Sequence, residues 1–491
     1  MPSVLAAPVT WLGGSAVLAF NVTVLMGLVL TAWAGWRLVL AWTGSPPAAL
    51  VAGALTIFNA HVLSRLPHAM AAHLWGVPLT LLAADRLLDH PGSRRTALAL
   101  ILIVAATAAT SVYWLALAGL VVGAVMIAGL ATGRARGAVV AGGAALAGVA
   151  LALPVLRPYL RLAAAGGTRP LEIVAQFAAT PAGYLTATSR LHAGWTSMFF
   201  RDEVNVFFAG VTAIALAAVG IAAALRAQGI PAARRAQGIA AASVPGTAQT
   251  PGASDAGMPH ASGAVTRRRA LTIVGLAAVG VFLSFGPATA LYRWLYTWVP
   301  PLHGLRAPAR FGYLYLLAVA VLAGFGVRRV VAGRGPWRAG ALTALALALV
   351  TLEVTQAPIR TEPFEGIPPI YDVLARDAGP VRLVELPFFP AEAVFENGEY
   401  QLNATRHWRP IMNGTSGFTP MSYRRRAAVF WFFPREGTIE AMRAEGATHL
   451  MIHFDRFTPA EGAEIRRVLL HRTDLRLLAA DGRGHQLYAL R

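Results

Sequence analysis

The chain has 491 residues, of which 56% are hydrophobic and only 13% charged, and its mean hydropathy is +0.55. Soluble domains carry about 25% charged residues, so this composition excludes an ordinary soluble protein and indicates a membrane protein. The formal net charge is +19, and the 25 arginines and seven acids up to Ala357 supply +18 of it. This excess positive charge lies in loops between apolar segments rather than on one basic face. Such a distribution argues against a nucleic-acid partner.

Ten apolar segments approach the length of about 20 residues that a helix needs to cross the hydrocarbon layer. Two of them come from one long apolar run, 96–131, which we divide at Thr110 and Ser111. The predicted spans are 16–41, 47–63, 70–88, 96–110, 112–131, 138–156, 205–225, 270–287, 311–327 and 339–356.

Arginine gathers on alternate loops between these spans, and the positive-inside rule assigns such loops to the cytoplasm. The intervening loops, including 157–204 and 288–310, are then extracytoplasmic, as is everything after residue 357. This parity also places the N-terminus outside, although residues 1–14 lack the features of a signal peptide. We therefore expect one upstream helix and its outer loop to be absent from this chain.

The composition divides the chain into four parts. Membrane helices fill 1–225, which includes the outer loop 157–204, and a second set fills 270–357. Between them, 226–269 is rich in Ala, Gly, Ser, Pro and Gln, so we expect a disordered cytoplasmic linker whose arginines bind anionic lipid headgroups. The last part, 358–491, has the composition of a soluble domain.

The tail shows alternating strand and helix signals. VRLVELPF and HLMIHFD read as strands, TIEAMRAEGA and EGAEIRRVLLHR as helices, and the last residues as a hairpin turning near Asp481-Gly482. The predicted fold class is therefore mainly α: a polytopic helical membrane domain of about ten transmembrane helices, followed by a small extracytoplasmic α/β domain.

Acidic residues at membrane depth are costly and are candidates for function, but three have simpler explanations. Asp85 and Asp89 stand near Arg86 at the end of a predicted span, where surface ion pairs explain them. Glu353 stands alone near an outer helix end and could reach the membrane interface.

The other candidate acids, Glu172, Asp202 and Glu203, share the long outer loop. Asp202 and Glu203 immediately precede a predicted span, so one interpretation is that they cap that helix and favour its dipole. The other interpretation is that they are catalytic, because they lie in a loop region rich in arginine.

Arg65, His68 and His73 fall on the outer side of the second and third spans. The two histidines are five residues apart and do not share one helical face as an i, i+4 metal pair would, so a divalent cation is only weakly supported and no other cofactor is expected. Each histidine is either a neutral side chain near lipid headgroups or a hydrogen-bonding and proton-accepting group for a phosphate or sugar.

Arg306 and Arg310 bracket Pro308 in LRAPARFG, just before an apolar span. The planar guanidinium suits phosphate because it donates two parallel hydrogen bonds. A bend at Pro308 would aim both arginines at one anion. The alternative is interfacial anchoring, together with the nearby tyrosines and tryptophans.

Three stretches, HAMAAHLWGVPLTLLAADRLL, LRAPARFGYLYLLAVAVLAGFGV and GATHLMIHFDRF, together resemble a bacterial group of large multi-pass membrane proteins related to the type C glycosyltransferases, which use polyprenyl-phosphate sugars. The resemblance runs from about Leu18 onward. It implies that the long outer loop and the LRAPAR segment face the lipid-linked donor and that the tail is an extracytoplasmic α/β domain. Type C enzymes carry their key acidic residue in the first outer loop, and this chain begins beyond that point.

The leading hypothesis is a glycosyltransferase-like protein of the bacterial inner (plasma) membrane that transfers a sugar from a polyprenyl-phosphate donor to a glycan, lipid or protein acceptor at the outer face. Glu203, Asp202 or Glu172 would act as base on the acceptor hydroxyl, while arginines stabilise the leaving phosphate. The alternatives are a catalytically inactive scaffold or a lipid-linked glycan transporter of the same architecture.

Overall fold

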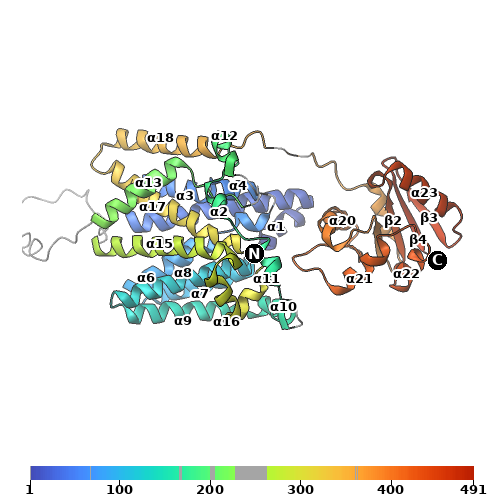
Figure 1. Cartoon of the computed structure of the whole chain (residues 1–491), viewed down its shortest axis with the longest axis horizontal. Helices are drawn as coiled ribbons and strands as arrows, with labels where there is room; N and C mark the ends of the chain where they lie inside the picture. Colours follow the sequence, from blue (N-terminus) through green and yellow to red (C-terminus); the bar gives the residue numbers. More distant parts are fainter. Residues whose placement is uncertain are drawn as a thin grey trace, which may run out of the picture. The chain divides into compact units, whose positions relative to one another are not determined.

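The computed structural model describes residues 2–66, 68–164, 168–199, 205–226, 263–359, 361 and 363–490. The chain forms two compact units, Met1–Arg360 and Thr361–Arg491. The first unit is a bundle of helices, and the second contains a small sheet flanked by helices (Figure 1).

The helical unit, with labels as in Figure 1, comprises α1 (Pro2–Trp11), α2 (Ala16–Thr43), α3 (Pro46–Ile57), α4 (Ala60–Ser64), α5 (Ala69–Ala72), α6 (Gly76–Asp89), α7 (Arg94–Thr110), α8 (Val112–Ala131), α9 (Ala135–Leu151), α10 (Leu153–Ala164), α11 (Leu171–Ala175), α12 (Ala193–Thr196), α13 (Val211–Arg226), α15 (Gly263–Ser284), α16 (Ala290–Trp298), α17 (Tyr313–Val331) and α18 (Pro336–Val354). Each of the ten predicted spans overlaps at least one of these helices, and 47–63, 70–88 and 138–156 each overlap two.

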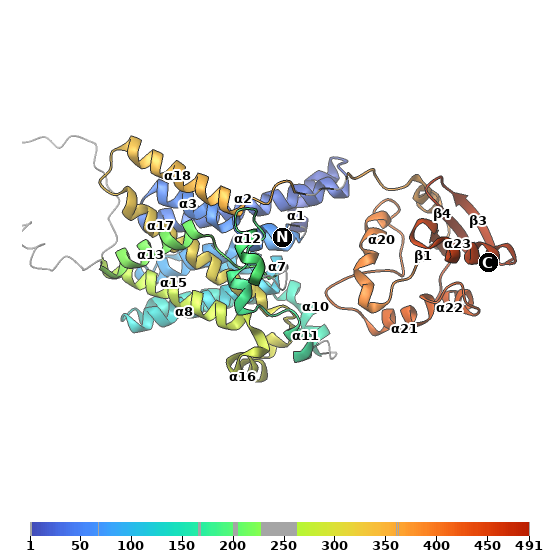
Figure 2. The ribbon, with the colours of Figure 1, turned by 45° about the horizontal axis from the view of Figure 1, so that its top comes forward.

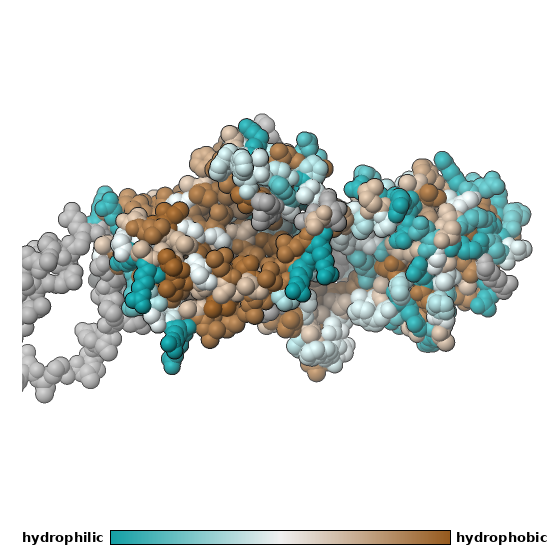
Figure 3. Space-filling model, turned by 90° about the horizontal axis from the view of Figure 1, so that it is seen from below, coloured by the Kyte–Doolittle hydropathy of each residue, from teal (hydrophilic) through white to brown (hydrophobic). Residues whose placement is uncertain are grey.

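Five helical stretches of the described chain are long and apolar enough to cross a membrane, and the bent pair α9–α10 would make a sixth. Figure 3 shows hydrophobic residues over much of the visible side of the helical unit, whereas hydrophilic residues predominate on the tail unit. The first unit therefore has the apolar helices expected of a membrane protein, while ten crossings remain a prediction.

The predicted division of the apolar run 96–131 is confirmed at a single residue. Ser111 has an extended backbone conformation between α7 and α8, and its side chain accepts a hydrogen bond from the Tyr113 amide at 3.1 Å. Serine favours such N-cap positions because its hydroxyl oxygen satisfies an amide that the first helical turn leaves without a partner.

Helix α17 forms the centre of the helical unit, where every residue from Leu316 to Val327 is buried. Two glycines allow it to approach α13 closely. A Cβ added to Gly326 would lie 2.0 Å from the carbonyl oxygen of Leu216, and one added to Gly220 would lie 2.0 Å from that of Leu322. Small residues at such crossings are typical of helices packed within membranes, where they bring the two backbones into direct contact.

The tail unit contains a four-stranded sheet of order β1-β2-β4-β3. Strands β1 and β2 are parallel, whereas β2–β4 and β3–β4 are antiparallel. Strands predicted in VRLVELPF, HLMIHFD and the terminal hairpin are present, as are both predicted helices, so the α/β pattern of the tail is confirmed. Its elements are α19 (Asp372–Arg376), β1 (Leu383–Leu386), α20 (Asn397–Ala404), α21 (Met421–Phe430), α22 (Thr438–Ala444), β2 (His449–His453), α23 (Pro459–Leu470), β3 (Leu475–Ala480) and β4 (His485–Leu490).

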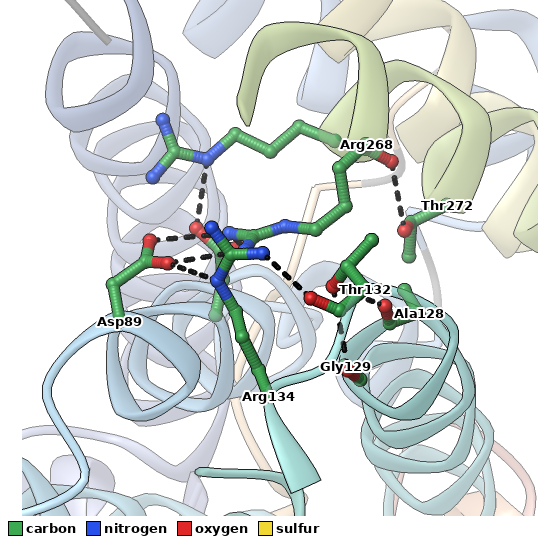
Figure 4. Close-up of polar contacts among 9 residues, drawn as sticks. Asp89, Ala128, Gly129, Thr132, Arg134, Arg268 and Thr272 are labelled. Carbon is green, nitrogen blue, oxygen red and sulfur yellow. Dashed lines mark hydrogen bonds and ion pairs between the residues drawn. The ribbon is translucent and has the colours of Figure 1, made fainter. Parts of the chain in front are cut away.

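A partly buried ion-pair network joins α6, α15 and the start of α9 (Figure 4). The guanidinium of Arg268 contacts Asp85 at 2.7 Å and Asp89 at 3.1 Å, and the side chains of Arg268 and Asp85 are 4% and 5% exposed. Arg269 also contacts Asp85, at 2.8 Å, and Arg134 contacts Asp89 at 2.9 Å.

This network corrects two sequence-based expectations. Asp85 and Asp89 do not form surface pairs with their neighbours, because their partners come from α15 and from the turn before α9. Helix α15 begins at Gly263, so the last residues of the predicted linker 226–269 are helical, and Arg268 and Arg269 neutralise acids rather than lipid headgroups. The residues 227–262 lie outside the described part of the chain.

Replacing Arg268 with alanine is expected to destabilise the helical unit by about 3 kcal/mol, because it leaves buried acid charge less well compensated. Thermal unfolding of the purified protein in detergent, followed by tryptophan fluorescence, measures the effect. Arg267→Ala is the matched control, since this neighbouring side chain is exposed on the same helix. Equal transition temperatures for the two variants would contradict the assignment of the network as a stabilising element.

Candidate anion site at the start of helix α17

The residues 305–312, which we call the lip, lead into α17 through the 3-10 turn η5 (Pro308–Gly312). The backbone amides of Arg306 and Ala307 both donate to the hydroxyl oxygen of Tyr113, at 2.8 and 2.9 Å. Tyr113 stands at the start of α8, so one side chain fixes the conformation of the lip against a neighbouring helix.

The two predicted arginines of the lip rest on aromatic rings. The guanidinium carbon of Arg310 lies 4.1 Å from the centroid of the Tyr113 ring, and that of Arg306 lies 4.5 Å from the Phe177 ring. Neither guanidinium has an acidic partner among the described residues. Such stacking orients a guanidinium without neutralising it, because the ring contributes only its quadrupole.

Arg65 and His68 extend the same positively charged region. Arg65, directly after α4, donates from Nη2 to Oδ1 of Asn205 at 3.2 Å. Partial burial lowers the pKa of His68, and the positive charges of Arg65 and Arg310 lower it further. The imidazole is therefore held in its neutral form near pH 7, in which it can both donate and accept a hydrogen bond.

Among the other predicted site residues, His73 has a role in helix packing. Its Nε2 bonds to the carbonyl oxygen of Thr23 at 3.0 Å, and a Cβ added to Gly27 would lie 2.7 Å from the ring, so His73 packs closely on α2. Glu172 is exposed in the first turn of α11. Asp202 and Glu203 lie outside the described residues.

Figure 1 and Figure 2 show α10, α11 and α16 near one another in the helical unit. The lip follows α16 and bonds to the loop after α11, since the Ala309 amide donates to the carbonyl oxygen of Phe177 at 3.2 Å. The predicted residues Arg65, His68, Arg306 and Arg310 are thus supported by helices and loops from widely separated parts of the sequence.

The polar contacts of Glu353 could not be predicted from the sequence. The expectation that it stands alone is wrong: the residue is 9% exposed, and its carboxylate accepts from the Thr212 hydroxyl at 2.5 Å and from the Thr212 amide at 3.0 Å. His192 Nε2 lies 3.7 Å away. A carboxylate suits the first turn of α13 because the amides there carry partial positive charge.

The tail contains a second buried polar cluster, also missed. Glu385 on β1 is fully buried; its Oε2 accepts from the Tyr371 hydroxyl at 2.6 Å and lies 2.7 Å from His453 Nε2. Burial, together with the charge of Glu385, raises the pKa of Tyr371 well above its usual value, so Tyr371 stays a donor. The available signal was a histidine at the end of one predicted strand and an acid within another.

No model of a known protein family matches the chain, and no curated protein matches it.

Replacing Tyr113 with phenylalanine removes the acceptor for the two lip amides. Leaving such amides without a partner costs about 1–3 kcal/mol, so hydrogen exchange at Arg306 and Ala307 should accelerate by about five- to 150-fold. Hydrogen-exchange mass spectrometry of peptides covering the lip measures this. Tyr159→Phe is the control, because Tyr159 is exposed on α10; equal exchange in both variants would show that Tyr113 does not hold the lip.

Proposed function

We propose that the lip is the binding site for the phosphate of a lipid-linked substrate. The observation that carries the proposal is that Arg306 and Arg310 are oriented by aromatic rings yet have no acidic partner among the residues described. A fixed cation without a counterion costs desolvation energy, and an incoming phosphate offsets that cost through charge-assisted hydrogen bonds. The apolar helices around the lip suit the lipid tail of such a substrate.

We further propose that the substrate is a polyprenyl-phosphate sugar and that the protein transfers the sugar to a glycan, lipid or protein acceptor. Arg306 and Arg310 would stabilise the negative charge that develops on the leaving phosphate. Neutral His68 would hydrogen-bond to the phosphate or sugar. A carboxylate must take the proton of the acceptor hydroxyl, and Glu203, Asp202 and Glu172 are the candidates.

The proposed location is the bacterial inner membrane, with the lip and the tail on the extracytoplasmic side. Two features support this orientation. The arginine-rich loops alternate along the sequence, as the positive-inside rule requires. The cluster of Arg134, Arg268 and Arg269 also lies at the chain segments predicted to be cytoplasmic, where it joins the ends of three helices.

Binding and transfer are tested separately. Arg306→Ala and Arg310→Ala should each weaken binding of a sugar-free polyprenyl phosphate at least about tenfold, because each loses a charge-assisted hydrogen bond of about 1.5–3 kcal/mol. Arg306→Ala should also abolish sugar transfer in proteoliposomes, while its amount in the membrane stays unchanged. Native mass spectrometry of the detergent-solubilised protein measures binding, and radiolabelled sugar measures transfer.

Arg329→Ala is the matched control, since Arg329 is an exposed arginine at the opposite end of α17. Unchanged binding in both lip variants would remove the lip from the proposal. Lip-dependent binding without transfer from any tested donor would instead favour the second candidate, a scaffold or lipid-linked glycan transporter. A scaffold would also tolerate the loss of Glu172, Asp202 and Glu203 together.

A further inference from the structure

Two histidines and an aspartate converge at one edge of the tail sheet. His453 ends β2 and His485 begins β4, and the antiparallel register of the two strands makes them direct partners. Asp455 follows β2 by two residues. Each of the three residues offers a potential ligand atom, and these atoms all lie within 4.8 Å of one another.

One ring nitrogen of each histidine contacts a carboxylate. His453 Nε2 lies 2.7 Å from Glu385, and His485 Nδ1 lies 2.7 Å from Asp481. Asp481 is itself fixed by the β3–β4 turn, because it also accepts from the His485 amide at 2.9 Å. Histidines that bind metals commonly have this arrangement, in which a carboxylate on the second nitrogen orients the ring and increases its basicity.

The remaining nitrogens are His453 Nδ1 and His485 Nε2. The side chain of His453 is 1% exposed, and its Nδ1 has no hydrogen-bond partner. A buried polar atom without a partner costs about 1–3 kcal/mol, so its presence needs a compensating interaction. His485 Nε2 lies 3.7 Å from Asp455 Oδ1, which is longer than a hydrogen bond.

We propose that His453 Nδ1, His485 Nε2 and Asp455 form a binding site for a divalent transition-metal ion, with zinc as the best match. Two imidazoles and one carboxylate suit zinc better than calcium or magnesium, which prefer oxygen ligands. Ligand atoms around tetrahedral zinc lie about 3.4 Å apart, so the 3.7 Å separation of His485 and Asp455 requires only a small contraction.

The site has one open side. Side-chain exposure rises from 1% at His453 to 9% at His485 and 50% at Asp455. Three protein ligands with a solvent-facing fourth position are typical of catalytic rather than structural zinc sites. The nearby cation Arg456 contacts Glu399, and it forms no direct ion pair with Asp455.

The test uses the full chain in detergent, purified with a tag that contains no histidine and stripped with a chelator. Calorimetric titration should show that each chain binds about one Zn²⁺ ion with a dissociation constant below about 1 μM. Co²⁺ should give the absorption bands of a four-coordinate site. Asp455→Asn and His485→Gln should each weaken Zn²⁺ binding at least about 100-fold. Asp481→Asn should keep the stoichiometry but weaken binding about 10- to 100-fold, because it only orients His485.

His471→Gln and Glu436→Gln serve as controls, since both residues are exposed in the same unit. Asp455→Asn keeps the test valid should His485→Gln fold poorly, because Asp455 is half exposed. Absence of stoichiometric Zn²⁺ binding by the wild type, or equal binding by Asp455→Asn and the controls, would overturn the proposal. The outcome is independent of the proposed sugar transfer, because no variant touches the lip.

Discussion

The burial of α17 from Leu316 to Val327 is the constraint on which the helical unit depends. A helix surrounded on all sides by other helices must bring small residues to its contacts, and Gly326 meets this need against the carbonyl oxygen of Leu216. The contact is so close that any side chain on Gly326 would push α13 away. Because α17 cannot shift along its axis without breaking such contacts, its first turn is a fixed point. The lip is attached to that turn, so the orientation of Arg306 and Arg310 follows from packing deep in the bundle.

The helical unit stabilises its arginines in two different ways. Arg268 is buried and neutralised by Asp85 and Asp89, so it joins helices and is not available to an external anion. Arg310, in contrast, rests on the ring of Tyr113 and keeps its charge. The first arrangement is strongly stabilising only while all partners are present, whereas the second leaves a charge that a phosphate can neutralise. The charge of the lip arginine is therefore available to an external anion, whereas the charge of Arg268 is not.

The sequence predicted features that depend on local pattern. Apolar length located the helices, the polar Thr110 and Ser111 located the break between α7 and α8, and alternating signals located the strands of the tail. It could not predict contacts between distant residues. Glu353 bonds to Thr212 across 141 positions, and nothing near either residue indicates the other. For the candidate site, the sequence predicted the residue types from the chemistry of phosphate recognition. It could not predict the supporting role of Tyr113, because that role depends on how α8 packs against the lip.

The tail cluster also depends on contacts between distant residues, and its buried acid poses an energetic problem. A single-residue change of pairing between β2 and β4 would turn His453 and His485 to opposite faces, so their meeting depends on the whole sheet. Glu385 is fully buried beside them, and a buried carboxylate is costly unless positive charge or several donors compensate it. Tyr371 and His453 supply donors to only one of its two oxygens. A dication on the far side of the His453 ring would add the missing positive charge, so the proposed metal explains the buried acid as well as the histidine nitrogen without a partner.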